Sequence, residues 1–203
     1  MILAFDTSSE ACTAALFEPG GKLIARSDER IGRGHAERLV PMIADLIGNV
    51  RPSQLLVGIG PGSFTGIRVA IAAAHGLSIG WDCELLGFSS LALLAASVEP
   101  DGEPIAVATL GGHGQLFVQQ FDARLEPAAP VMSLVPEEAA KAIHARRVAG
   151  SGAAQLVAAR GSGQAIEAWP QAARVLDLPE ALRTLAPRPV YVRGPDAKAK
   201  AAA

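Results

Sequence analysis

The sequence predicts an α/β protein built from two similar halves, each a mixed sheet with flanking helices. Short β-forming runs separated by turns open the chain, and helical segments follow them. The same order begins again near Ile105, after a stretch rich in proline, glycine and acidic residues at 98–104. We therefore expect one unit over residues 1–100 and a second over 101–195.

The first three strands are predicted at 2–6, 12–17 and 22–28, and the short turns between them indicate an antiparallel meander. Asp6 ends the first strand and is followed by Thr7, Ser8 and Ser9. An aspartate there could orient a magnesium-bound phosphate, or it could cap the following turn with its own side chain. Because no second carboxylate accompanies it, we favour the turn cap.

A helix is predicted over residues 35–47, with apolar side chains covering more of its surface than one sheet can bury. Pro41 lacks the amide that a mid-helix position donates, so we expect a kink or a late helix start. His35, like His75 further on, is more often a capping or packing histidine than a ligand.

The densest motif is Gly-Ile-Gly-Pro-Gly-Ser-Phe-Thr-Gly-Ile-Arg at 58–68, between a predicted strand at 55–59 and a predicted helix at 64–79. Such a turn presents amides at the positive end of a helix, which suits an anion, yet chains also turn this way for structural reasons alone. It is not a P-loop, because no Lys-Ser or Lys-Thr pair follows the glycines. The residues of a possible phosphate or adenylate site are Asp6, Gly60, Gly62, Ser63, Thr65 and Arg68.

The helix at 64–79 is apolar nearly all round and rich in alanine and glycine, so its outer side needs a partner. A core helix of a large monomer would look the same. Two adjacent helices of this kind in a half of about 100 residues favour a protein interface. The interface candidates are His35, Leu39, Met42, Ile43, Leu46, Val69, Ala70, Ala73 and Leu77.

A strand at 84–87 and a helix at 89–97 complete the first half. The second half is predicted to hold strands at 105–109, 115–121 and 131–134, with a possible further strand at 146–149. Helices are predicted at 136–145, 152–159 and 178–185, and disorder at 196–203. Two meander-plus-helices halves suggest the duplicated ribonuclease-H-like fold of sugar kinases, Hsp70 and actin.

Composition excludes several classes of function. A net charge of −2 over 203 residues offers no surface for a polyanion, so independent tRNA binding is not expected. The two cysteines lack CxxC spacing, which favours a reducing compartment. No secretory leader is recognisable and the most apolar window is too short for a bilayer, so we expect a cytoplasmic protein without membrane contact.

The sequence also argues against catalysis. A kinase of this fold holds magnesium nucleotide between acidic residues of both halves, and the second turn, at 109–115, contains no carboxylate. The four histidines are scattered and no GxSxG elbow occurs, so we expect no metal, no cofactor and no catalytic residue. The alternatives are a small-molecule kinase or ATPase that uses the 60–68 loop, and a regulatory protein that holds adenylate near Ser63 and Thr65.

Residues 60–68, together with 5–8 and 35–41, resemble the TsaB (YeaZ-like) family, a subunit of the bacterial machinery for tRNA threonylcarbamoyladenosine synthesis. The resemblance is dense over residues 1–96 and returns near 189–193. Where relatives show Asp-Ala-Arg before Glu-Val-Tyr, this chain has Leu110, Gly111 and Gly112 before Gln115. A role that relatives assign to that element does not carry over.

The resemblance implies a non-catalytic scaffold. Proteins of this family pair with the catalytic paralogue TsaD through a bundle formed by the helices equivalent to 35–47 and 64–79, and the pair recruits the ATPase TsaE. The complex transfers a threonylcarbamoyl group to N6 of adenosine 37 in tRNAs that read codons beginning with A. Residues 89–94 offer serine and leucine where TsaD carries two metal-binding histidines. The resemblance thus implies tRNA contact only through the complex, and a homodimer when TsaD is absent.

Overall fold

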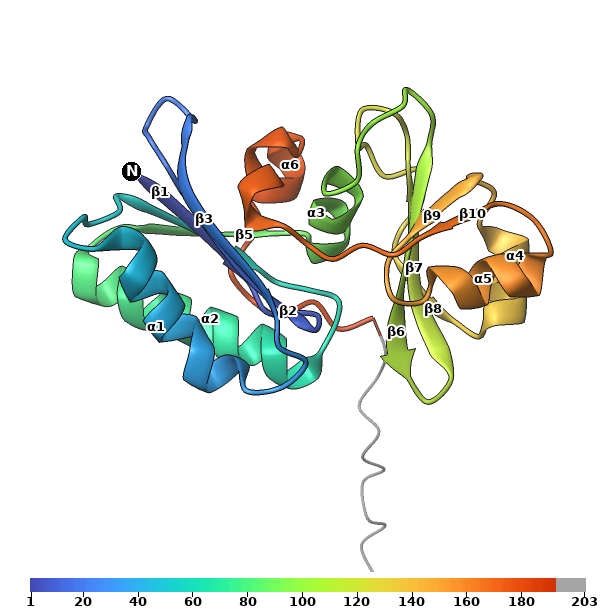
Figure 1. Ribbon diagram of the computed structural model, residues 1–203, viewed down its shortest axis with the longest axis horizontal. Coiled ribbons are helices and arrows are strands. Elements are labelled where there is room, and N and C mark those ends of the chain that lie inside the picture. Colours follow the sequence, from blue (N-terminus) through green and yellow to red (C-terminus); the bar gives the residue numbers. More distant parts are fainter. Residues whose placement is uncertain (193–203) are drawn as a thin grey trace, which may run out of the picture.

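Two five-stranded sheets form the framework of the protein (Figure 1). The computed structural model describes residues 1–192, so the disorder predicted for 196–203 lies outside the described residues. The first sheet has the strand order β3-β2-β1-β4-β5 and the second the order β10-β9-β6-β7-β8. The predicted α/β class is confirmed.

The first sheet contains the predicted meander of β1 (Ile2–Asp6), β2 (Ala11–Phe17) and β3 (Leu23–Arg30). Each of these strands is antiparallel to the next, whereas β4 (Gln54–Gly58) and β5 (Glu84–Phe88) add in parallel beyond β1. Strands β1 and β2 are buried almost throughout, because both faces of this sheet are covered.

Helices α1 (His35–Ile47) and α2 (Phe64–Trp81) lie side by side on one face of this sheet (Figure 1). Helix α1 begins at His35 and includes Pro41, so the late start that Pro41 suggested is not observed. Arg38 donates two hydrogen bonds to the carboxylate of Glu29, which ties α1 to the edge strand β3. Helix α3 (Ser90–Ala96) follows β5 on the other face.

The second half repeats this plan with β6 (Ile105–Gly112), β7 (Gln115–Phe121), β8 (Met132–Leu134), β9 (Arg147–Ala149) and β10 (Gln164–Ile166). Its helices are α4 (Pro136–Ala142) and α5 (Ala153–Arg160). Strands β6, β7 and β8 form the antiparallel part, and β9 and β10 add in parallel. When the second order is reversed to β8-β7-β6-β9-β10, it matches the order β3-β2-β1-β4-β5 position for position. This match confirms two ribonuclease-H-like subdomains.

The core is arranged in layers that Figure 1 shows from left to right. One apolar cluster fills the space between α1, α2 and the first sheet, and another lies between the second sheet and α4 and α5. A third joins the two sheets around α3, whose seven residues are all buried. Helix α3 is therefore the shared centre of the molecule.

The C-terminal segment returns to the first half. The helix predicted at 178–185 is replaced by a 3₁₀ helix (Ala172–Asp177) and the four-residue α6 (Glu180–Arg183). Leu185 then exchanges two backbone hydrogen bonds with Gly87 at the edge of β5, and the Val190 amide donates to the Ile59 carbonyl at 2.9 Å. The unit boundaries at 100 and 195 stay predictions. Among the described residues, no helix combines the length and the apolarity that crossing a bilayer requires.

Candidate functional site: the cleft between the halves and the outer face of α1 and α2

Asp6 is buried where β1 ends, and its carboxylate is fully engaged by neighbouring donors. Oδ1 accepts hydrogen bonds from the Ser8 amide and the Ser8 hydroxyl, both at 2.7 Å. Oδ2 accepts from the Ser90 hydroxyl at 2.5 Å. Burial raises the pKa of Asp6, and the bonds from Ser8 and Ser90 act in the opposite direction. The predicted turn cap is confirmed.

The glycines of the motif make room for this turn. A Cβ on Gly62 would collide with the Ser8 carbonyl oxygen, one on Gly66 with the Thr7 carbonyl oxygen, and one on Gly58 with the Asp6 carboxylate. Gly60 adds a backbone φ of 92°, which glycine adopts without strain. The motif loop therefore packs backbone to backbone on the β1–β2 turn.

The amides of the motif loop are used within the chain. The Gly60 amide donates to the Ser90 hydroxyl at 3.0 Å, and the Ser63 amide donates to the Ser8 carbonyl at 2.6 Å. The Gly66 amide donates to the Ser63 hydroxyl at 3.2 Å, so Ser63 is the N-cap of α2. An incoming phosphate would have to compete with these bonds.

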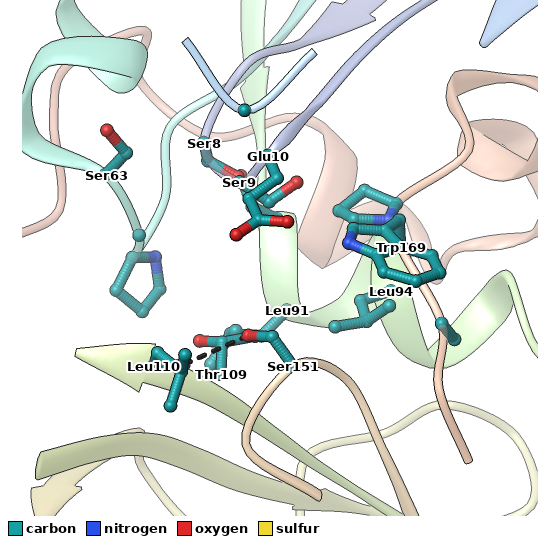
Figure 2. Close-up of a pocket in the computed structure, with 16 residues that line it drawn as sticks. Ser8, Ser9, Glu10, Ser63, Leu91, Leu94, Thr109, Leu110, Ser151 and Trp169 are labelled. Atoms are coloured by element: carbon teal, nitrogen blue, oxygen red, sulfur yellow. Dashed lines mark hydrogen bonds between the residues drawn. The ribbon is translucent and has the colours of Figure 1, made fainter. Parts of the chain in front are cut away.

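A cleft of about 190 Å³ lies beside this loop, between the two halves (Figure 2). Its wall in the first half is formed by the β1–β2 turn, the motif loop and the start of α3. Its wall in the second half is formed by the end of β6, the β9–α5 turn and residues 168–170. Of the six residues of the possible phosphate site, Gly62 and Ser63 line the cleft. Asp6 lies buried beneath the turn, and Thr65 and Arg68 lie outside the lining.

The wall from the second half carries no carboxylate at the place of Asp6. The paired residues Phe5 and Val57 correspond to Val107 and Ala149 in the second sheet, so the position of Asp6 is taken by Ala108. The Gly-Ser-Gly turn at 150–152 follows β9 as the motif loop follows β4, and is its counterpart in the second half. Its Gly152 amide donates to the Ala108 carbonyl at 2.9 Å.

The chemistry of the cleft is that of hydroxyls, one indole and one carboxylate. Glu10 accepts a hydrogen bond from Arg30 Nε at 3.1 Å and forms an ion pair with Arg30 at 3.0 Å. The Arg30 guanidinium lies 4.1 Å from the ring centroid of Trp169. Thr109 Oγ1 and Trp169 Nε1 are buried without a hydrogen-bond partner among the described residues. The lining can hydrogen-bond a small polar molecule, but Glu10 is its only charged residue, and a phosphate there would meet a carboxylate.

Metal ligands do not gather in the part of the chain that the structure describes, and its two thiols are not activated. No group of three His, Cys, Asp or Glu side chains among residues 1–192 is arranged as a metal site requires. Burial raises the pKa of the Cys12 thiol to about 12, and Cys83 is half-buried, with burial also raising its pKa. Neither thiol is activated as a nucleophile.

Five of the nine interface candidates face the protein's own core. His35, Leu39, Met42, Ile43 and Ala70 are buried between α1, α2 and the first sheet. They therefore do not belong to the outer surface of the two helices. The remaining four, Leu46, Val69, Ala73 and Leu77, are half-buried. The interface candidates chosen from the sequence thus lie mostly on the inner side of the two helices.

The outer face of α1 and α2 is formed by residues that the sequence analysis did not assign to it. Ile79 is 82% exposed, Phe64 62% and Val40 52%. Exposed alanines and glycines lie between these larger side chains. The signal that could have located this face is the spacing of three or four residues along α2. On α2 its members are Phe64, Arg68, Ala72, Gly76 and Ile79, and on α1 they are Ala36, Val40 and Ala44.

Comparison with known sequences identifies relatives for most of the chain. Residues 28–172 match the family described as TsaD, tRNA N6-adenosine threonylcarbamoyltransferase. The tRNA threonylcarbamoyladenosine biosynthesis protein TsaB of Escherichia coli K12 is 38% identical over 99 residues, which are 46% of this chain and 42% of that protein. TsaB of Buchnera aphidicola subsp. Schizaphis graminum is 33% identical over 128 residues, 60% of each chain. The match thus spans about two fifths of the Escherichia coli relative.

Solved structures extend the likeness to nearly the whole chain. An uncharacterised Pseudomonas aeruginosa protein with similarity to peptidase YeaZ is 30% identical, with a TM-score of 0.79 over 95% of this chain and 99% of that one. YeaZ from Pseudomonas aeruginosa is 27% identical, with a TM-score of 0.76 over 94% and 98%. The family match covers well over half of the chain, and the protein therefore belongs to the TsaD family, within which it is TsaB/YeaZ-like.

Proposed function

We propose that this protein is a non-catalytic scaffold in tRNA threonylcarbamoyladenosine synthesis, and that it pairs with a TsaD-like catalytic paralogue through the outer face of α1 and α2. The single observation that carries the proposal is this face, where Ile79, Phe64 and Val40 are largely exposed on two adjacent helices. The pair recruits a TsaE-like ATPase and meets tRNA only as a complex in the cytoplasm. Alone, the protein forms a homodimer through the same face.

The physical support comes from the cost of leaving this face in water. Burying apolar surface contributes about 25 cal/mol per Å², so covering side chains of this size stabilises a complex by several kcal/mol before its entropic costs. The small residues between them, such as Ala72 and Gly76, let a partner helix approach closely. An obligate interface has this apolar composition.

That the protein catalyses no reaction of its own is proposed because Asp6 is not available to a ligand. A carboxylate that orients a metal-bound phosphate needs free lone pairs toward the cleft, whereas Asp6 is buried and accepts three hydrogen bonds. Its counterpart in the second half is Ala108, so the paired carboxylates of a kinase site are missing at these two positions.

The test is co-purification of the tagged chain from its native cell, with identification of the co-eluting protein. We expect a larger TsaD-like paralogue with wild type, and its loss with Ile79→Arg. Leu110→Arg is the matched control, because Leu110 is also an exposed large apolar residue, at 51%, but lies at the cleft. Recovery of equal amounts with Ile79→Arg, or of no paralogue with wild type, would contradict the proposal.

A further inference from the structure

Two polar atoms in the wall of the cleft between the halves have no hydrogen-bond partner within residues 1–192. They are Thr109 Oγ1 on β6 and Trp169 Nε1 in the segment after β10, and both atoms are buried. Buried hydroxyl and indole N–H groups are nearly always hydrogen-bonded, because an unpaired one has lost its bond to water and gained nothing. Both atoms thus call for a partner from the cleft.

Two serine hydroxyls of the lining add further donors. Ser9 Oγ accepts from the Ala11 amide at 3.1 Å, and Ser151 Oγ accepts from the Leu110 amide at 3.2 Å. In the part of the chain that the structure describes, neither hydroxyl donates its own proton to an acceptor. A hydroxyl that accepts one bond can still donate one. The lining therefore offers several neutral donors to a ligand.

The cleft also offers one acceptor, the carboxylate of Glu10. Arg30 contacts only one of its oxygens, with Nε at 3.1 Å and Nη2 at 3.0 Å from Oε2. Among residues 1–192, Oε1 has no hydrogen-bond partner. Because Arg30 balances the charge of Glu10, the cleft is close to neutral while it presents donors and an acceptor together.

These groups face one another across a small space. Figure 2 shows Glu10 and the indole nitrogen of Trp169 on one side of the cleft, and Thr109 and Ser151 on the other. Leu91 and Leu94, each 1% exposed, add apolar side chains that suit C–H groups. The volume of about 190 Å³ lies below the roughly 300–1,000 Å³ of sites for drug-sized ligands. The space therefore suits a ligand no larger than a monosaccharide.

We propose that this cleft binds a small uncharged polyhydroxylated molecule, a polyol or a monosaccharide, between the two halves. Oxygens of the ligand accept from Trp169 Nε1 and the Thr109 hydroxyl, and one ligand hydroxyl donates to Glu10 Oε1. The inference goes beyond the scaffold role, requires no reaction and does not depend on a partner protein.

The charges around the cleft favour an uncharged ligand over an anion. A phosphate or a carboxylate would face Glu10, the one charged residue of the lining. The nearby Arg30 is already shared between Glu10 and Glu167, at 3.0 and 3.6 Å. A polyol carries donors and acceptors in equal number and brings no charge that the cleft would have to balance.

The experiment follows the indole N–H signals of the ¹⁵N-labelled full chain by NMR while D-glucose, myo-inositol or glycerol is added. The chain has two tryptophans, and Trp81 on α2 lies outside the lining, so its signal is the internal control. Trp169→Phe assigns the two signals. We expect at least one of the three compounds to shift the Trp169 signal saturably and to leave the Trp81 signal in place.

Thr109→Val tests the part of the hydroxyl. It removes a buried polar atom that has no partner within residues 1–192, so the ligand-free variant should unfold at the wild-type temperature or above it. Its dissociation constant for the compound that binds should rise at least ~10-fold, because one hydrogen bond to the ligand is lost. Thr184→Val is the matched control: Thr184 is exposed and outside the lining, and this variant should bind as wild type does.

A Trp169 signal that none of the three compounds moves at ~100 mM would overturn the inference, since the two buried atoms would then bind water only. An unchanged dissociation constant for Thr109→Val would overturn it as well. A saturable shift with inorganic phosphate or glycine, but with none of the polyols, would overturn the uncharged class of ligand. Each of these results leaves the scaffold role to its own test by co-purification.

Discussion

The Ser90 hydroxyl donates a 2.5 Å hydrogen bond to the carboxylate of Asp6, across 84 positions of the chain. The same hydroxyl accepts from the Gly60 amide at 3.0 Å, so it joins the end of β1, the motif loop and the start of α3. A hydroxyl with one proton makes both bonds at once. The Asp6 carboxylate thus accepts hydrogen bonds from residues of its own chain on both oxygens.

Asp6→Asn should change the pH dependence of stability. Burial raises the pKa of Asp6 above its ordinary 3.8, so the folded protein holds this proton more tightly than the unfolded chain does. The wild-type free energy of unfolding therefore falls as pH rises from about 3.8 to the raised folded-state pKa, and stays at the lower value above it. Asparagine does not titrate, and its curve lacks this fall.

Urea unfolding of both proteins at several pH values tests this. The wild-type advantage over Asp6→Asn should shrink as pH rises, whereas Asp45→Asn, at an exposed position, should follow wild type. If the free energies of unfolding of wild type and Asp6→Asn change with pH in parallel, burial does not raise the pKa of Asp6 in the folded protein.

Gly66→Ala should destabilise the protein although alanine favours helices. At an open helix position, replacing glycine by alanine stabilises the protein by up to about 1 kcal/mol. At Gly66, however, the new Cβ would clash with the Thr7 carbonyl oxygen. We expect a loss of about 2 kcal/mol or more. The control is Gly80→Ala in the same helix, where nothing lies within 4 Å of the new Cβ. Thermal unfolding should separate the two variants, and equal shifts would refute the close packing of the loop on the turn.

Thr13→Val should loosen the attachment of the C-terminal segment. The buried Thr13 hydroxyl accepts from the Ala172 amide at 2.7 Å and donates to the Asp28 carboxylate. Valine keeps the shape but leaves a buried amide without a partner, which costs about 1–3 kcal/mol. Hydrogen exchange should accelerate at Ala172 and its neighbours in the 3₁₀ helix. Unchanged protection there would mean that the amide does not depend on Thr13.

Magnesium ATP should give no saturable heat with the isolated protein in calorimetry. The amides of Gly60, Ser63 and Gly66 already donate within the chain, and Glu10 is the charged group of the cleft. A phosphate would displace these bonds and meet a carboxylate. Saturable, magnesium-dependent binding at millimolar nucleotide would restore the kinase or ATPase alternative.

The sequence was most informative where composition and turns decide structure. The meander, helix α1 to the residue, and the duplicated order of strands could all be predicted from alternating runs and turn residues. Strand β10 was missed, because three residues, of which only Ile166 is half-buried, give no apolar pattern. The helix at 178–185 was overpredicted, because Leu185 pairs with Gly87 instead of continuing a helix.

The candidate site was harder to predict for a physical reason. Helix α2 is apolar on nearly every side, so its sequence does not indicate which side faces the sheet, and buried Ala70 looked the same as exposed Ala72. The role of the motif glycines was equally hidden. Glycine is required at 62 and 66 because the carbonyls of Ser8 and Thr7, about 55 positions away along the chain, leave no room for a Cβ. A contact between such distant residues leaves no pattern in the neighbouring sequence.

The central claim is that the outer face of α1 and α2 binds a TsaD-like paralogue. Isothermal titration of the purified paralogue with wild type and with Ile79→Arg tests it most directly. The account predicts saturable binding of wild type and a loss of at least ~100-fold in affinity for Ile79→Arg, with unchanged thermal stability because Ile79 is exposed. Equal affinity of the two proteins, or no binding by wild type, would contradict it.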